Sequence, residues 1–200
     1  MVYLMLAKIL LMTALAYGFG ASHAVGELLH RGGYRWFPRA DWIAPLVAAG
    51  FGVGMLYLAH PTVYVAFLAI LGSWALSGRL FAVDGAVIAA AVLGFVWMQT
   101  PILAVDPLSW PYFAATMIGA AGLGWWARRG TGRVATATLH LLEGRYHWYA
   151  IGAGYALLFE LDSPLFLSLY GFMSGAAAVQ TRARTGQFQT WGLKRSAANG

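Results

Sequence analysis

Polar side chains inside apolar stretches are where chemistry is expected in this sequence, because an ionisable group is costly to bury among apolar surroundings. Lys8 is the most interior of these groups, and it can either extend to the nearest aqueous surface or meet an acid there. Gln99 ends a later apolar stretch, where bonding at the interface is favoured over lining a pathway. The candidate residues of a substrate pathway are Lys8, Gln99, Glu160 and Asp162.

Four histidines form two pairs, and the members of each pair are seven residues apart, which places them on one helical face. Paired imidazoles can ligate haem, another tetrapyrrole or a metal ion. All four lie near basic stretches, so the favoured interpretation is histidine at a membrane interface, and no cofactor is predicted. These residues are His23, His30, His140 and His147.

A glycine-rich segment offers phosphate chemistry. Gly130, Gly132 and Arg133 can present backbone N–H groups and a guanidinium to a phosphate or an anionic lipid at the start of a helix. The favoured interpretation is simpler, a flexible basic connector on the cytoplasmic side. No residue is predicted to be catalytic, and an enzyme is the less favoured class.

The composition explains why polar groups are so few. The 200 residues are 60% hydrophobic and 10% charged, whereas soluble domains are about 25% charged. A soluble chain of this length could not cover so much apolar surface, so lipid must cover part of it. The net charge of +6 does not indicate nucleic acid, because the basic residues flank apolar runs. The lack of cysteine excludes disulfides and thiolate metal sites.

The basic residues predict the orientation of the chain. Twelve of the thirteen lie in four short stretches, at 31–39, at 79, at 128–145 and at 182–195. Cytoplasmic ends of membrane helices carry such an excess of Lys and Arg. We therefore expect a multi-pass protein of the cell inner membrane, with its N-terminus outside and its C-terminus cytoplasmic. The basic tail suits the anionic inner leaflet of the bilayer, which is the expected partner.

Apolar runs bounded by charge or proline predict about seven transmembrane helices in an all-α bundle. The runs cover residues 3–22, 42–59, 62–77, 86–99, 109–127, 148–161 and 165–179. Several are shorter than the roughly 20 residues that a spanning helix needs, and a re-entrant pair is an alternative for 86–99 and 148–161. Pro61 and Pro164 mark turns on the face opposite the arginines, since proline ends a helix.

The sequence also resembles itself. Residues 28–37 (LLHRGGYRWF) match residues 141–149 (LLEGRYHWY) when one residue is deleted. Each stretch leads into a hairpin that closes at an arginine, which predicts two parallel three-helix units. Two such units need a linking helix to restore direction. The predicted plan is a first unit over 3–79, a linking helix over 80–100, a second unit over 109–182 and a cytoplasmic tail over 183–200.

This 3+1+3 plan resembles the sugar-facilitator and nicotinamide riboside transporters. The segment 165–172 (LFLSLYGF) is similar to the aromatic-glycine helix end of the riboside transporters. The resemblance implies a small-solute carrier or facilitator.

A second resemblance is partial. Residues 130–137 (GTGRVATA) are similar to the phosphate-binding loop of the bacterial acyl-phosphate:glycerol-3-phosphate acyltransferases. Ser22, Gly26, Leu28 and Leu29 fall loosely on the first motif of that family. The resemblance implies a membrane lipid acyltransferase.

Small residues support a third function. Glycine and alanine residues together form small helix faces, spaced three or four residues apart, that bring helix backbones together in membranes. The glycines of these faces lie at 50, 52 and 54, at 119, 122 and 124, and at 152 and 154. Such faces predict homo- or hetero-oligomers, and with them a non-catalytic accessory subunit of a larger complex that contacts lipid or pigment.

Overall fold

The described part of the chain is helical throughout, apart from one short ladder and the turns. The computed structural model describes residues 2–31, 34–59, 63–64, 67–68, 71–72, 83–98, 109–143, 150–151, 153–154, 157, 164–187 and 194–195. Within these residues the helices are α1 (Val2–Arg31), α2 (Ala40–Leu58), α4 (Val83–Met98), α5 (Ser109–Arg129), α6 (Arg133–Glu143) and α8 (Pro164–Arg184). The expected all-α class is thereby confirmed.

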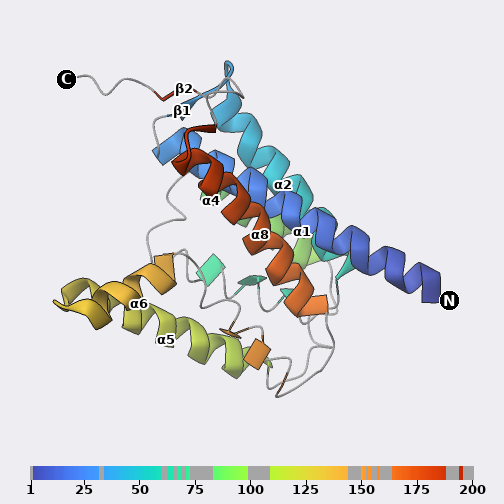
Figure 1. Ribbon diagram of the computed structural model, residues 1–200. Coiled ribbons are helices and arrows are strands. Elements are labelled where there is room, and N and C mark those ends of the chain that lie inside the picture. Colours follow the sequence, from blue (N-terminus) through green and yellow to red (C-terminus); the bar gives the residue numbers. More distant parts are fainter. Residues whose placement is uncertain are drawn as a thin grey trace.

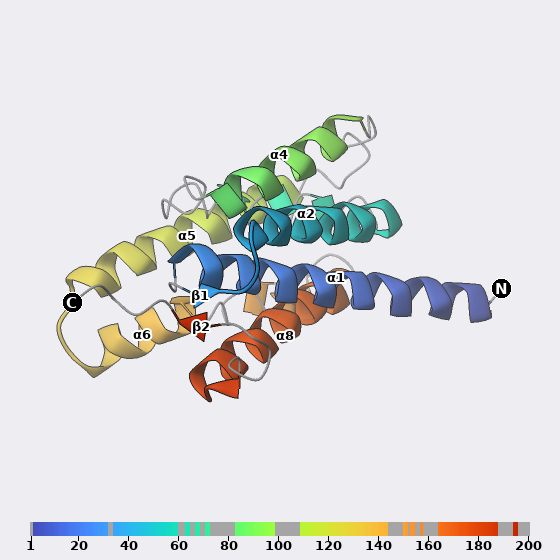
Figure 2. The ribbon, with the colours of Figure 1, turned by 90° about the horizontal axis from the view of Figure 1, so that it is seen from above.

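Helix α1 is the central element. It runs for 30 residues, or about 45 Å, and packs between α2 and α8 (Figures 1 and 2). It continues nine residues past Ser22, where the first apolar run ends, so His23 and His30 lie on the same helix as Lys8. The first three turns of α1 extend beyond its neighbours, and Tyr3 is 88% exposed.

Glycine allows α1 and α8 to approach backbone to backbone. A Cβ atom added at Gly20 would meet the carbonyl oxygen of Phe172, and one at Gly175 would meet that of Tyr17. A Cβ at Gly171 would lie 2.7 Å from the carbonyl oxygen of Thr13. Close approach through small residues is how membrane helices gain van der Waals contact when lipid is as apolar as leucine.

Phenylalanine and glycine alternate across the α1–α2 contact. Phe51 of α2 lies over Gly18 of α1, at 2.8 Å from a Cβ added there. Phe19 of α1 lies over Gly52 of α2, at 3.4 Å from a Cβ added there. Each ring fills the space that the missing side chain of the opposite helix leaves. This confirms that Gly52 lies in a helix contact, as its small-residue face predicts.

The core is aromatic. Phe19 and Phe172 have ring centroids 4.9 Å apart, and Phe67 lies 5.8 Å from Phe19. Such tilted pairs add to the energy of burial. Tyr64 meets Phe95 edge to face at 5.9 Å, which brings α4 to the same core. Residues from α1, α2, α4, α5 and α8 therefore share one apolar cluster.

Helices α5 and α6 form a hairpin of their own. They pack against each other, and their connecting turn lies toward the same end of the molecule as the end of α1 in both views (Figures 1 and 2). Helix α6 was not predicted as a separate element, because it lies in the segment taken for a basic connector. The ends of α1, α5 and α8 that carry arginines thus share one end of the bundle.

A two-residue antiparallel ladder joins the tail to the first linker. Strand β1 (Tyr34–Arg35) pairs with β2 (Lys194–Arg195), with Arg35 opposite Lys194 and Tyr34 opposite Arg195. The predicted basic tail therefore returns to the α1–α2 linker.

Two described helices are long and apolar enough to cross a membrane, namely α1 over Tyr3–His30 and α2 over Ala40–Leu58. The runs expected at 86–99, 109–127 and 165–179 coincide with α4, α5 and α8 within a few residues. The runs expected at 62–77 and 148–161 lie largely outside the described residues, and the few described positions in them are helical. The number of spans and the repeat stay predictions.

Replacing Gly175 by alanine tests the α1–α8 contact. The new methyl group would lie against the backbone of Tyr17 and Ala21, which cannot move aside as a side chain can. We expect a loss near the upper end of overpacking costs, about 3 kcal/mol, in thermal unfolding of the detergent-purified protein.

Gly50→Ala is the matched control, because a Cβ there meets no described atom within 4 Å. That change is expected to be neutral or to stabilise by up to about 1 kcal/mol, since alanine favours helix. Equal effects of the two substitutions would contradict the proposed packing.

Candidate functional site

The α1–α2 linker ends in a strained residue. Arg39 has φ 65° and ψ 13°, the left-handed conformation that glycine usually occupies. Its carbonyl oxygen accepts the first bonds of α2, from the backbone N–H groups of Trp42 at 3.0 Å and Ile43 at 3.1 Å. A non-glycine residue held in this conformation costs on the order of 1 kcal/mol or more and points to a local function.

A histidine replaces a missing backbone bond in α2. Pro45 lies inside the helix and has no N–H, so it cannot donate to the carbonyl of Asp41 four residues earlier. The Nε2 atom of His30 lies 2.7 Å from that carbonyl oxygen. Because a carbonyl only accepts, Nε2 carries the proton and donates it. His30 therefore fixes the end of α1 to the first turn of α2.

The linker and the two helices enclose a groove of two compartments, which we call the linker groove. Its basic compartment has a volume of about 580 Å³ and is lined by Leu29, Tyr34, Arg35, Trp36, Phe37, Pro38, Arg39, Ala40 and Asp41. Its apolar compartment, of about 150 Å³, is lined by Ser22, Val25, Leu29, Trp36, Phe37, Ala40, Ile43, Ala44 and Val47. Leu29, Trp36, Phe37 and Ala40 belong to both, so the two compartments adjoin each other.

The apolar compartment follows the helix axes. Ser22, Val25 and Leu29 lie on one face of α1, and Ala40, Ala44 and Val47 lie on one face of α2. The eight residues from Ala40 to Val47 span about 10 Å along α2. The groove therefore begins at charged groups and continues between apolar helix faces.

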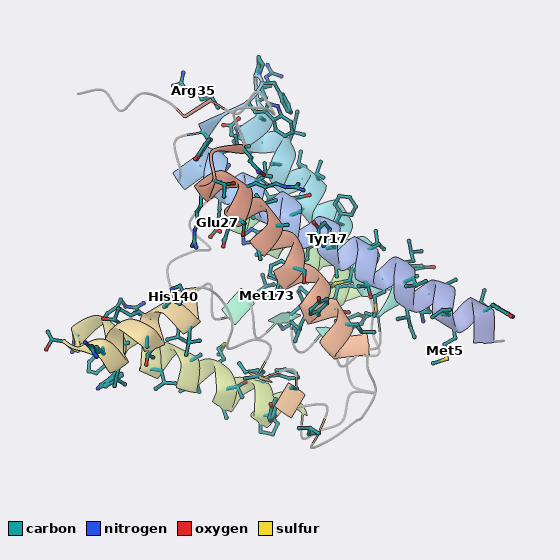
Figure 3. All side chains as sticks on the ribbon, viewed as in Figure 1. Met5, Tyr17, Glu27, Arg35, His140 and Met173 are labelled. Carbon is teal, nitrogen blue, oxygen red and sulfur yellow. The ribbon has the colours of Figure 1, made fainter. Side chains whose placement is uncertain are left out.

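Arginines supply the charge of the basic compartment. Arg35 and Arg39 are exposed, and Asp41 is half-buried. The ladder pairs Lys194 with Arg35 and Arg195 with Tyr34 along the backbone. Figure 3 shows Arg35 at the end of the molecule opposite Met5. An anion with a planar or tetrahedral group matches the fork of donors that guanidinium groups offer.

The predicted phosphate segment forms the start of α6. Gly132 has φ 125°, which only glycine adopts readily, and its carbonyl accepts from the backbone N–H of Thr136 at 3.1 Å. Gly130 donates its N–H to the carbonyl of Trp126 and so ends α5. Arg133 is the first helical residue and lies with Thr136 and His140 beside a shallow surface cavity of about 650 Å³. The segment is an ordered turn, and its phosphate role stays a prediction.

The histidines are placed separately. His23 is 4% exposed and stacks on Phe172 of α8, with centroids 6.0 Å apart, so it belongs to the core rather than to an interface. His30 contacts α2, and His140 lies exposed on α6 (Figure 3). His147 lies outside the described residues. Within the described ranges, no three His, Asp or Glu residues gather as a metal site would need.

The predicted pathway residues can be followed only in part. Lys8 is exposed on the projecting end of α1. Gln99, Glu160 and Asp162 lie outside the described residues, so a contact of Lys8 with Glu160 or Asp162 and the place of Gln99 in a pathway stay predictions.

Sequence reasoning did not predict the linker groove. It assigned the basic stretch at 31–39, which includes Arg35 and Arg39, to topology, and it placed Ser22 and Leu29 only on a loosely matched family motif. The signal that points to the groove is Pro45, because a proline inside an apolar run leaves a carbonyl that needs another donor.

Comparison of this chain with protein families, curated proteins and solved structures finds no match.

A double-mutant cycle of His30 and Pro45 tests the link between α1 and α2. His30→Ala is expected to cost about 1–2 kcal/mol in unfolding free energy, because the carbonyl of Asp41 loses its donor. Alanine at position 45 supplies a backbone N–H for the same carbonyl.

His30→Ala should therefore cost about 1 kcal/mol less in a Pro45→Ala background. Additive effects in denaturant unfolding of the purified protein would show that the histidine does not replace the missing bond.

Proposed function

We propose that this protein is a multi-pass membrane protein that binds an amphiphile with an anionic head group in the linker groove. The observation that carries this proposal is that a basic compartment adjoins an apolar one, with Trp36 and Phe37 lining both. The proposal includes seven spans in two three-helix units, insertion in the cell inner membrane, an N-terminus outside and a cytoplasmic linker groove.

The anionic head would lie among Arg35 and Arg39. Arginine binds phosphate through paired N–H donors, and such charge-assisted bonds are stronger than neutral ones.

The backbone of Arg39 gives independent support. Glycine at this position would remove the strain of the left-handed conformation, yet the chain carries a charged residue. A guanidinium at the mouth of the groove gives a reason for that strain, because glycine would relieve the backbone and lose the charge.

The hydrocarbon part of the ligand would lie between α1 and α2. Val25, Ile43 and Val47 are apolar lining residues, and Trp36 is 46% exposed at the boundary between the compartments. Tryptophan is favoured at this depth of a bilayer. A lipid of the cytoplasmic leaflet has its head and chain arranged in the same order as the two compartments.

Other functions predicted from the sequence stay predictions. A small-solute carrier would be supported by uptake of sugars or vitamins into proteoliposomes. An accessory subunit is favoured by one observation, the exposure of Tyr3, Leu4 and Met5 on the projecting end of α1, which another helix or lipid can cover. An acyltransferase would draw on the Gly130–Arg133 turn, which lies on a different hairpin from the linker groove.

Variants of Arg39 test lipid binding. Delipidated protein is titrated with phosphatidylglycerol in detergent, and bound lipid is counted by native mass spectrometry. Arg39→Gly is expected to reduce the affinity for phosphatidylglycerol about tenfold or more through the loss of charge-assisted bonds. The same change should raise the free energy of unfolding by up to about 1 kcal/mol. Arg39→Lys should keep part of the affinity, because lysine retains the charge and loses the paired N–H donors.

Two further variants serve as controls. The first tests whether the loss of any exposed arginine lowers lipid binding, and the second tests whether the hydrocarbon chain of the lipid contributes to it. Arg184→Gln removes an exposed arginine at the end of α8 and should leave lipid binding to the groove unchanged. Val47→Trp fills the apolar compartment, so it should weaken phosphatidylglycerol binding and spare glycerol 3-phosphate. Equal lipid binding by the wild type, Arg39→Gly and Val47→Trp would refute the proposal.

A further inference from the structure

Helix α6 is too short to cross a bilayer. Its 11 residues span about 16 Å, roughly half of the hydrocarbon core. It packs against α5, and the two helices are joined by the Gly130–Gly132 turn (Figures 1 and 2). We call these two helices and their turn the α5–α6 hairpin. A short helix at the end of a spanning segment must lie beside the membrane or in its interface.

Three faces of α6 meet three different surroundings. Ala135 is buried, and Leu142 lies 3.6 Å from a Cβ added at Gly124, so this face packs on α5. Arg133, Thr136 and His140 follow each other at helical spacing and line the shallow cavity on the polar face. The inner and polar faces therefore account for only part of the helix circumference.

The third face of α6 is apolar and exposed. Val134 is 71% exposed and Leu141 is 53% exposed. The two residues are seven positions apart and so share one side of the helix. Ala137, which is also exposed, lies between this side and the shallow cavity that it lines. An apolar strip next to a cationic strip is the pattern of a helix that lies in the plane of a membrane interface.

The end of α5 supplies matching anchors. Trp125 and Trp126 are 55% and 46% exposed, and the guanidinium carbon of Arg129 lies 4.0 Å from the centroid of the Trp125 ring. This contact keeps a cation beside an indole, where the head groups of a bilayer favour both. Arg128 is exposed on the same turn.

Charge selects the kind of membrane. Arg128, Arg129 and Arg133 lie within six residues, and the sequence has no acid from Pro107 to Leu142. Basic residues close to a bilayer are attracted to anionic lipids, and this attraction falls off within a Debye length. The hairpin therefore fits an anionic leaflet better than a neutral one.

We infer that α6 lies in the head-group layer of an anionic leaflet, with Val134 and Leu141 inserted toward the acyl chains and Thr136 and His140 facing water. Arg128, Arg129 and Arg133 hold the helix there through lipid phosphates. This inference rests on the proposed membrane insertion, with α5 as a spanning helix, and on the residues of the α5–α6 hairpin. The linker groove contributes no residue to it.

Single-cysteine labelling tests the depth of α6, and the chain suits it because it has no cysteine of its own. Val134→Cys and Thr136→Cys are each introduced into the full-length protein and carry a nitroxide label. The proteins are reconstituted in phosphatidylcholine vesicles with and without phosphatidylglycerol. Collision with oxygen, which concentrates in lipid, is compared with collision with a water-soluble nickel chelate.

In vesicles with phosphatidylglycerol, the ratio of oxygen collisions to nickel collisions should be several-fold higher for the label at position 134 than for the label at position 136. The contrast should shrink without phosphatidylglycerol, and also when Arg128, Arg129 and Arg133 are replaced by glutamine. The matched pair lies two residues apart on one helix, so a folding defect would affect both labels alike.

Equal accessibility at positions 134 and 136 would overturn the inference. An immobilised label at position 134, protected from both reagents, would also overturn it, because a protein partner rather than lipid would then cover the strip. A contrast that does not depend on phosphatidylglycerol would remove the role of the arginines. Loss of lipid binding at the linker groove leaves all of these outcomes unchanged.

Discussion

The contact of α1 with α8 without intervening side chains is the constraint on which the bundle depends. Gly20, Gly171 and Gly175 bring two backbones together, so dispersion acts along several turns of helix. Because α8 occupies this side of α1, the rings of Phe19 and Phe172 meet at its border, and α2 packs on another side of α1. The aromatic core then follows from the space that the glycines leave.

The site near the linker depends on the same arrangement through one further interaction. The bond from His30 to the carbonyl of Asp41 connects the end of α1 with the start of α2. It fixes the two walls of the linker groove at the level where the arginines lie. Pro45 has no N–H for the carbonyl of Asp41, and His30 donates to that carbonyl instead, which connects the two helices. The linker groove lies beside this bond. Structure and candidate binding chemistry thus meet in the first turn of α2.

Sequence reasoning predicted most of the helices and little of their contacts. Apolar runs and their arginine ends are local signals, so α2, α4, α5 and α8 could be located from them. The contact of Gly20 with α8 could not, because it depends on which helices are neighbours across about 150 residues of chain. His23 was taken for an interfacial residue for the same reason, since its neighbour Phe172 is distant in sequence. The left-handed backbone of Arg39 has no signal in residue type.

The position of α8 has a consequence for how the chain is made. Its partner α1 leaves the ribosome about 150 residues before α8. At synthesis rates of about 5–20 residues per second, the glycine side of α1 waits for roughly seven to thirty seconds. During that interval a surface built for close backbone contact is not yet covered by α8. The glycine side of α1 must therefore stay unoccupied until α8 has been synthesised, and this depends on the surroundings of α1 during that time.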